Sequence, residues 1–192
     1  MITYELGDNL YINLTNKCSN SCSFCIRDSS DNYLSHYNLW LDTEPSYDEF
    51  LKEIKEKDLK KYNEIVFCGY GEPTYRIDLM KQIAEFFHDK VIRLNTNGQG
   101  NLVNKRDIVP ELTDFLDIIS ISLNGSTQEE YQKKCHSIYD KVFDEILDFA
   151  GKCVKNKIET RFSVVEGCVD NIDECKRIAN SLGIELFIRK LA

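Results

Sequence analysis

Residues 10–25 read Leu-Tyr-Ile-Asn-Leu-Thr-Asn-Lys-Cys-Ser-Asn-Ser-Cys-Ser-Phe-Cys, and this stretch decides the fold. In its first half, Leu10, Ile12 and Leu14 occupy every second position and more polar residues lie between them. Such alternation is typical of a β-strand with one apolar face. The second half carries three cysteines with the spacing Cys-x3-Cys-x2-Cys. The stretch therefore predicts a strand that leads directly into a thiol-rich loop.

Five further segments have strand character, and helical patterns separate them. Strands that alternate with helices predict a parallel sheet with right-handed crossovers. The predicted strands are 10–15, 64–69, 91–96, 117–124, 158–165 and 185–190. The predicted helices are 47–62, 78–88, 107–115, 127–134, 141–156 and 172–182. Ser46 is the expected N-cap of the first helix, and Ser126 with Glu129 has the spacing of a capping box before the fourth.

Alternation within the strands favours one of two parallel architectures. Strands of a doubly wound sheet are buried on both faces and are apolar almost throughout, whereas most of these strands alternate. We therefore expect an α/β fold in which residues 1–192 form a single domain, a partial (β/α)6 TIM-like barrel with a hydrophilic cavity. The segment 64–69 does not alternate, so neither of its faces is assigned. The side chains expected to point into the cavity are Asn13, Asn95, Asn97, Ser122, Asn124, Arg161 and Ser163.

Polar and small residues follow the predicted strands. The first strand runs into the cysteines, the second into Gly69–Pro73, the third into 95–98, the fourth into 122–125 and the fifth into 166–167. In parallel α/β folds the active site lies at the carboxyl ends of the strands. We therefore expect these five segments to form one site.

The cysteine spacing at Cys18, Cys22 and Cys25 indicates a metal centre. Thiolates are the ligands of iron–sulfur clusters, and three of them leave one iron of a [4Fe–4S] cluster open to a small molecule. Two alternatives stay open on the motif alone. The same cysteines with His36 could form a Cys3His zinc site, or the thiols could bind no metal.

These motifs, in this order, resemble the radical S-adenosylmethionine (SAM) superfamily. The cysteine loop follows the first strand, and Phe24 precedes the last cysteine as in that family. The second strand ends in Gly69-Tyr70-Gly71-Glu72-Pro73, similar to the family's Gly-Gly-Glu-Pro element, from which it departs at the inserted tyrosine. The third strand ends in Thr-Asn-Gly at 96–98. The chain is most similar to the small TatD-linked radical SAM proteins, which run to about this length and carry the strings Phe-Cys-Gly-Tyr-Gly-Glu-Pro, here 67–73, and Asn-Thr-Asn-Gly-Gln-Gly, here 95–100.

The resemblance implies an oxidoreductase with a [4Fe–4S] cluster on Cys18, Cys22 and Cys25 and with SAM on the open iron. One electron cleaves SAM to a 5′-deoxyadenosyl radical, which abstracts hydrogen from a substrate that the sequence does not identify. It also implies an electron donor similar to flavodoxin or ferredoxin. Carried over by position, the residues expected to contact SAM are Phe24 at the adenine, Gly69, Gly71 and Glu72 at the amino group, Asn97, and Ser122 and Asn124 at the ribose or carboxylate.

Arg161 needs an anionic or acceptor partner if it lies in the cavity. That partner is a protein carboxylate, the SAM carboxylate or an anionic group of the substrate.

The remaining five cysteines divide into two groups. Cys153 and Cys175 lie on apolar helix stripes and Cys68 lies in a strand, so we expect all three to pack in the core. Cys135 and Cys168 lie in or near segments that follow strands, so either could face the cavity as a hydrogen donor or an extra ligand. They are the candidate catalytic residues.

Composition and charge limit the kinds of molecule that the chain is expected to bind and the compartment in which it is expected to lie. The 192 residues carry a formal net charge of −8, which makes bulk nucleic-acid binding unfavourable. No apolar run is long enough for a membrane span and no signal peptide is evident, so we expect a cytoplasmic protein whose eight cysteines are reduced. The long insertion at 26–45, with Tyr33, His36, Tyr37 and Trp40, is expected to pack on the barrel wall or to act as a lid.

An open barrel leaves a lateral opening, so the substrate could be a macromolecule that completes the site. Two alternatives to a radical SAM enzyme of this kind remain: a glycyl-radical activase that acts on a partner protein, and an iron–sulfur or zinc binding module without catalysis.

Overall fold

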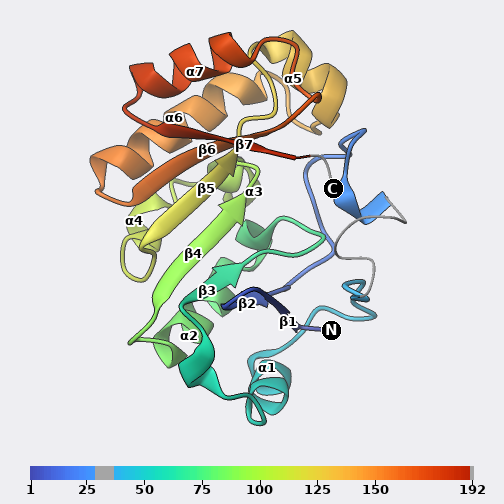
Figure 1. Cartoon of the computed structure of the whole chain (residues 1–192), viewed down its shortest axis with the longest axis vertical. Helices are drawn as coiled ribbons and strands as arrows, with labels where there is room; N and C mark the ends of the chain where they lie inside the picture. Colours follow the sequence, from blue (N-terminus) through green and yellow to red (C-terminus); the bar gives the residue numbers. More distant parts are fainter. Residues whose placement is uncertain (29–36, 191–192) are drawn as a thin grey trace.

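The computed structural model describes residues 1–28 and 37–190, whose strands form a seven-stranded sheet in the order β1 to β7 (Figure 1). The strands β2 to β7 pair in parallel, as predicted. β1 is an addition that the sequence pattern did not reveal: it pairs antiparallel with β2 through a turn at Gly7, whose φ is +57°. The bounds are β1 Thr3–Leu6, β2 Asn9–Ile12, β3 Glu64–Phe67, β4 Val91–Thr96, β5 Ile118–Ser122, β6 Glu159–Val165 and β7 Glu185–Arg189.

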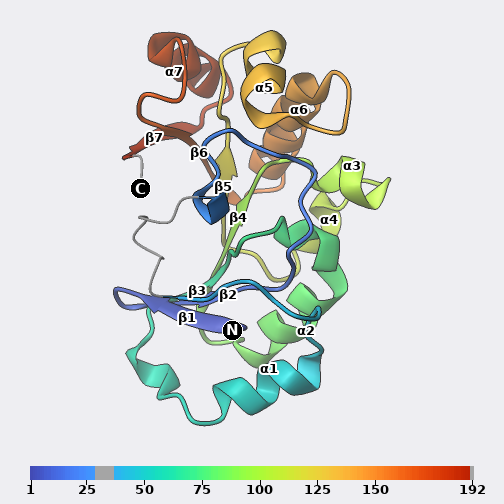
Figure 2. The same ribbon diagram turned by 90° about the vertical axis from the view of Figure 1, so that its right-hand side faces the viewer.

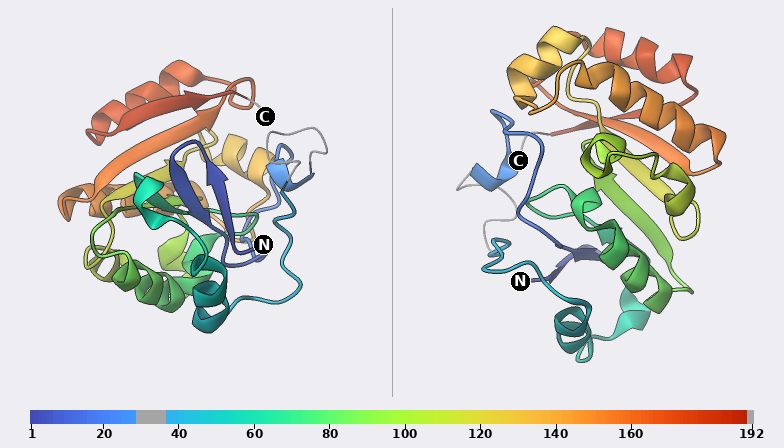
Figure 3. Two further views of the ribbon diagram at one scale, coloured as in Figure 1. Left: turned by 60° about the horizontal axis from the view of Figure 1, so that its bottom comes forward. Right: turned by 180° about the vertical axis from the view of Figure 1, so that it is seen from behind.

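The sheet curves into an open barrel, with β1 and β7 as its two edges (Figure 2). Helices cover the outer face, and the segment after β2 crosses the ends of the strands on the other side (Figures 2 and 3). The helices are α1 Tyr47–Ile54, α2 Ile77–Phe86, α3 Gly100–Asn104, α4 Val109–Leu112, α5 Gln128–Cys135, α6 Val142–Lys155 and α7 Ile172–Ser181, with 3-10 turns η1 Ile26–Asp28, η2 Leu59–Lys61 and η3 Pro73–Arg76. The expected α/β partial barrel is therefore confirmed.

Two helix predictions need correction. The helix expected over 47–62 ends at Ile54, because Asp58 caps the separate turn η2. The helix expected from Ser126 begins one residue later: the Thr127 side chain accepts from the Glu130 backbone N–H, and the Glu130 carboxylate accepts from Ser126. Within the described ranges, no helix is long and apolar enough to cross a membrane.

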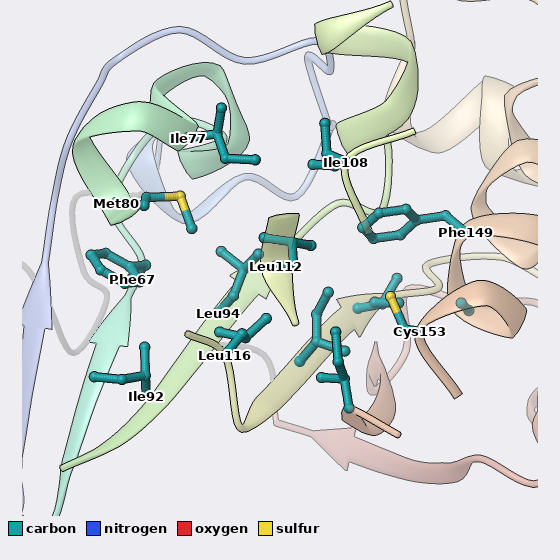
Figure 4. Packing of buried hydrophobic residues seen from close by; sticks show 14 of the residues in the cluster. Phe67, Ile77, Met80, Ile92, Leu94, Ile108, Leu112, Leu116, Phe149 and Cys153 are labelled. Atoms are coloured by element: carbon teal, nitrogen blue, oxygen red, sulfur yellow. The ribbon is translucent and has the colours of Figure 1, made fainter. Parts of the chain in front are cut away.

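The outer face of the sheet forms the main core. Leu10, Ile12 and Leu94 are fully buried beneath the helices, as the alternation predicted, and Phe67, whose face was not assigned from the sequence, is buried with them. Figure 4 shows Phe67 beside Met80 of α2, and Leu94 between Met80 and Leu112 of α4. β7 departs from the pattern, since Ile188 is 47% exposed at the sheet edge and is not covered by a helix.

The inner face of β1 and β2 is covered by the chain's own insertion. Tyr4 and Leu39 are buried there in a second apolar cluster, with Tyr11, Tyr37 and Tyr70 packed against them. The side-chain amide of Asn13, just after β2, donates to the Leu39 carbonyl at 2.6 Å. The described parts of the insertion therefore pack on the barrel wall, whereas Tyr33 and His36 lie outside the described residues.

Candidate functional site

The loop that carries Cys18, Cys22 and Cys25 crosses from β2 to α5. The backbone N–H groups of Ser21 and Ser23 donate to the carbonyls of Cys135 and Lys134, both at 2.9 Å. These bonds hold the loop against the C-terminal end of α5. All three cysteines are free and half-buried, so the loop presents thiols at the strand ends where the sequence placed the site.

The pKa values of all three thiols on the cysteine loop are raised above the ordinary value of a cysteine. Burial raises the pKa of Cys18 to about 11 and raises that of Cys25. Hydrogen bonding to Cys135, together with burial, raises the pKa of Cys22. The Arg27 guanidinium opposes each shift. Metal binding must displace the thiol protons, which makes loading dependent on pH.

The chemistry of the donors fits an iron–sulfur cluster: three soft sulfur ligands on one loop, close enough to affect each other's pKa, beside a cation that offsets cluster charge. Within residues 1–28 and 37–190, no three His, Cys, Asp or Glu side chains are already gathered around a single-ion position. The fourth zinc ligand of the alternative hypothesis, His36, lies outside the described residues.

The glycine loop after β3 lies directly on the cysteine loop. A Cβ added at Gly69 would lie 1.9 Å from Asn13 Oδ1, and one at Gly71 would lie 2.3 Å from the Thr15 carbonyl oxygen. The Glu72 backbone N–H donates to the Lys17 carbonyl at 2.7 Å. Both glycines are therefore required by close packing inside the chain. The inserted Tyr70 packs edge-on against Trp40, with 5.2 Å between ring centroids.

The carboxylate of Glu72 joins the segment that follows β3 to the end of β4. It is 3% exposed, and Oε1 accepts from the Thr74 backbone N–H and from the hydroxyls of Thr74 and Thr96, both at 2.7 Å. Oε2 accepts from the Asn97 backbone N–H at 2.7 Å. Burial raises the pKa of Glu72 although each of these donors lowers it. Glu72 thus stabilises the loops after β3 and β4 relative to each other, and its predicted contact with SAM stays a prediction.

A buried polar network joins the third strand end to the cysteine loop and α5. Gln99 Nε2 donates to Asn20 Oδ1 at 2.8 Å and to Tyr131 Oη at 2.9 Å, and the Ser137 hydroxyl donates to Gln99 Oε1 at 3.1 Å. Asn97 Nδ2 donates to Ser19 Oγ at 2.9 Å. Asn20, Tyr131 and Ser137 were not predicted as site residues because they match no motif, and Gln99 lies in the string at 95–100 without an assigned role.

Comparisons with known proteins agree with this geometry. A family model described as the Radical SAM superfamily matches residues 12–182. The chain belongs to this superfamily. Its members bind a [4Fe–4S] cluster and SAM, the cofactors that the thiol loop fits. A GTP 3′,8-cyclase of Clostridium perfringens is 28% identical over 162 residues, which cover 82% of this chain and 46% of the cyclase.

Solved structures show the same fold. "Native anSMEcpe with bound AdoMet" has a TM-score of 0.70 at 18% identity, covering 95% of this chain and 50% of that one. A radical SAM methyltransferase from Sphaerobacter thermophilus has a TM-score of 0.61 at 13% identity, covering 98% and 68%. This radical SAM chain thus spans less than half of the cyclase, and the comparisons do not identify its reaction.

The other predicted SAM contacts of this radical SAM domain lie around the same end of the barrel. Asn124, just after β5, is buried with a left-handed φ of +49°, and its Oδ1 has no hydrogen-bond partner among the described residues. Ser122 is half-buried at the end of β5. Phe24 packs against the main core as a half-buried side chain. Their contacts with SAM stay predictions.

Arg161 lies on the inner face of this radical SAM barrel, in line with Ser120 of β5 and Glu185 of β7. Its Nε donates to Glu159 Oε1 at 2.9 Å, and its guanidinium lies over the Phe187 ring, 5.6 Å from the centroid. A protein carboxylate is therefore its partner in this structure. Contact with the SAM carboxylate or a substrate anion stays untested.

The burial of the five cysteines outside the loop agrees with the sequence-based expectation for some of them and differs for others. Cys153 and Cys175 are fully buried, as predicted. Cys135 is also fully buried, beside Cys22 and away from the barrel interior, while Cys168 is half-buried in the turn after β6. Cys68 was expected in the core; it is half-buried just after β3, on the inner face near Asn95 and Tyr4. Ile65 and Phe67 face the helices, so Val66 and Cys68 face the barrel interior. This alternation could not be seen in the sequence, because Val66 is apolar like its neighbours.

Proposed function

We propose that this chain is a radical SAM enzyme that uses residues 1–192 as one catalytic core domain. Cys18, Cys22 and Cys25 would hold the [4Fe–4S] cluster, and SAM would bind its open iron beside the glycine loop. When bound, these cofactors supply a 5′-deoxyadenosyl radical by one-electron cleavage of SAM, and the radical takes hydrogen from the substrate. Placement in the TatD-linked group is part of the proposal.

One observation carries it. The cysteine loop, the glycine loop and the Thr96–Gly98 turn come from three different strands, yet hydrogen bonds through Glu72 and Asn97 join them into one unit. Since Glu72 already satisfies its oxygens within the protein, its part would be to hold backbone groups of 69–72 and 96–98 in position for SAM. A fixed arrangement of this kind provides orientation without movement during the reaction.

The inner face of β4 to β7 is the proposed substrate side. Asn95, Ser120 and Ser122 are half-buried there, opposite the face that the helices cover. Polar groups at this face can bind an anionic or hydrogen-bonding part of a substrate, including a segment of a macromolecule. Radical SAM enzymes generally need an electron donor, and a flavodoxin- or ferredoxin-like protein is the proposed one here.

The test is anaerobic reconstitution with iron and sulfide, followed by reduction in the presence of SAM. We expect about four irons per chain, as a [4Fe–4S] cluster requires, and formation of 5′-deoxyadenosine. Cys22→Ala should lose both, whereas Cys153→Ala, a buried cysteine outside the loop, should keep both. Tightly held zinc without iron uptake would instead show a zinc module, and iron without deoxyadenosine a non-catalytic cluster protein.

Two further measurements refine the proposal. Glu72→Gln keeps the shape of the side chain but turns an NH2 group toward a donor that the carboxylate now accepts from, and Glu72→Ala removes every one of these bonds. Both variants should therefore retain iron but lose most SAM binding. Unchanged SAM affinity in both variants would overturn the role given to the glycine loop. Transfer of an electron-spin signal to a partner protein would assign the chain to the glycyl-radical activases.

A further inference from the structure

Asn97 lies at the junction of the three loops, where its backbone N–H and both side-chain polar atoms are hydrogen-bonded. Its backbone N–H donates to Glu72 Oε2 at 2.7 Å, and its side-chain Oδ1 accepts from the Gln99 backbone N–H at 3.0 Å. Its Nδ2 donates to Ser19 Oγ at 2.9 Å and lies 3.9 Å from Cys18 Sγ, within donor range of a sulfur acceptor. These contacts fix the side-chain amide with its N–H groups toward the cysteine loop.

The Cys18 sulfur has a second donor from its own loop. The Asn20 backbone N–H points at Cys18 Sγ at 3.4 Å. Hydrogen bonds to the sulfurs of an iron–sulfur cluster are among the factors that set its reduction potential, because they stabilise the more negative, reduced state. The two N–H donors at Cys18 differ in origin: one is a backbone group of the cysteine loop, which a substitution does not remove, and the other is the side chain of Asn97, just after β4.

We propose that Asn97 is a positioning residue that raises the reduction potential of the cluster by donating to the Cys18 sulfur. This inference rests on the proposed function in one respect, since the cluster must be bound. It differs from the expected contact between Asn97 and SAM. It also joins the cluster to the glycine loop, because the amide that faces Cys18 belongs to the residue whose backbone holds Glu72.

Asn97→Asp tests the inference with little change of shape. The aspartate can still accept from Gln99 and from Ser19, and the backbone bond to Glu72 is untouched, but the donor to sulfur is replaced by a negative charge. Asn104→Asp is the matched control. Asn104 Nδ2 donates to the carbonyls of Thr74 and Gly100, both at 2.9 Å, so this variant loses an amide donor that makes no hydrogen bond to the cysteine loop within the described part of the chain.

The measurement is the midpoint potential of the reconstituted cluster, from a redox titration followed by electron paramagnetic resonance without SAM. We expect Asn97→Asp to lower the ratio of reduced to oxidised cluster at a fixed potential about tenfold, equal to about 59 mV for one electron. Asn97→Ala should shift it in the same direction by less, and Asn104→Asp should leave it unchanged.

An unchanged potential in both Asn97 variants would overturn the inference. So would a large loss of SAM affinity at an unchanged potential, because that result assigns Asn97 to SAM. If Asn97→Asp does not load iron, the alanine variant decides the question. A wild-type protein that takes up no cluster would refute the proposed function itself, which keeps the two failures distinct.

Discussion

The two halves of the barrel's inner face are built differently. On β1 and β2 the face is dry: Tyr4 and Leu39 are 2% and 0% exposed, and Tyr11 and Tyr37 pack beside them. On β6 and β7 the same face carries Arg161 and the 40% exposed Phe187. The first half is therefore closed by the chain's own insertion, and the second half is left accessible. A lateral opening in a partial barrel need not be covered evenly, and here the accessible half is the proposed substrate side.

The largest expected difference between the halves is in stability. Tyr4→Ala removes a buried ring that lies 5.1 Å from Tyr11 and 5.5 Å from Tyr37 between centroids, and should cost about 3–5 kcal/mol of unfolding free energy. Phe187→Ala, on the open half, should cost about 1 kcal/mol or less, because its ring is partly solvated and loses mainly the Arg161 contact. Urea denaturation of both variants measures this. Equal costs would contradict the division into a closed and an open half.

Glu130 should produce the next effect, and it depends on pH. Burial alone would raise the pKa of this carboxyl, but donors from Ser126, the Asp170 backbone and Lys134 lower it to about 2. A lowered pKa adds stability above the unfolded value near 4.5, and that stability is lost as the pH falls toward 2. Glu130→Gln should therefore cost about 2–3 kcal/mol at pH 7 and much less near pH 2.5. Glu129→Gln, on the exposed side of the same turn, should show no such trend in unfolding experiments across pH.

A substitution at Gly69 tests the close contact between the glycine loop and Asn13, which follows β2 in the closed half. Gly69→Ala places a methyl group on Asn13 Oδ1 and should cost about 1–3 kcal/mol. Gly151→Ala is the control: it meets nothing within 4 Å on helix α6, and it should stabilise the protein by about 0.4–1 kcal/mol. The double variant Asn13→Ala with Gly69→Ala should recover part of the loss if the clash is the cause. Additive costs in this double-variant cycle would rule the clash out.

Arg161→Met should have the smallest effect on stability, about 1 kcal/mol or less, because its ion pair with Glu159 is partly exposed. SAM affinity and product formation then distinguish three roles. Weaker SAM binding would indicate the cofactor carboxylate, and intact SAM cleavage without product would indicate a substrate anion. A change in stability alone would leave Arg161 as the structural partner of Glu159.

The sequence predicted structure best where a local pattern of residues is compatible with only one kind of structure. Alternating strands such as 10–15 predicted both faces, and the spacing of Cys18, Cys22 and Cys25 predicted the loop. β1 was missed because Thr3–Leu6 is a short edge strand whose pairing depends on a tight turn. The network of Gln99 and Tyr131 could not be predicted for another reason. Hydrogen bonds between residues 32 positions apart depend on the fold and produce no periodic pattern in the sequence.

Ser126 shows a subtler limit. Ser126 and Thr127 are adjacent residues that both favour the N-cap, and each has a glutamate three positions later. The structure chooses Thr127 because Glu130 also binds the Asp170 backbone, a tertiary contact that Glu129 does not make. Local chemistry therefore predicted a helix start within one residue, and tertiary structure selected the position.

The most direct test of the central claim is the electron paramagnetic resonance spectrum of the reduced, reconstituted protein before and after SAM is added. Three cysteine ligands leave one iron open, so the account predicts a [4Fe–4S] signal that changes shape when SAM binds that iron. The change should be absent in Glu72→Ala, which should keep the signal itself. A cluster signal that SAM leaves unaltered in the wild-type protein would contradict the proposed site.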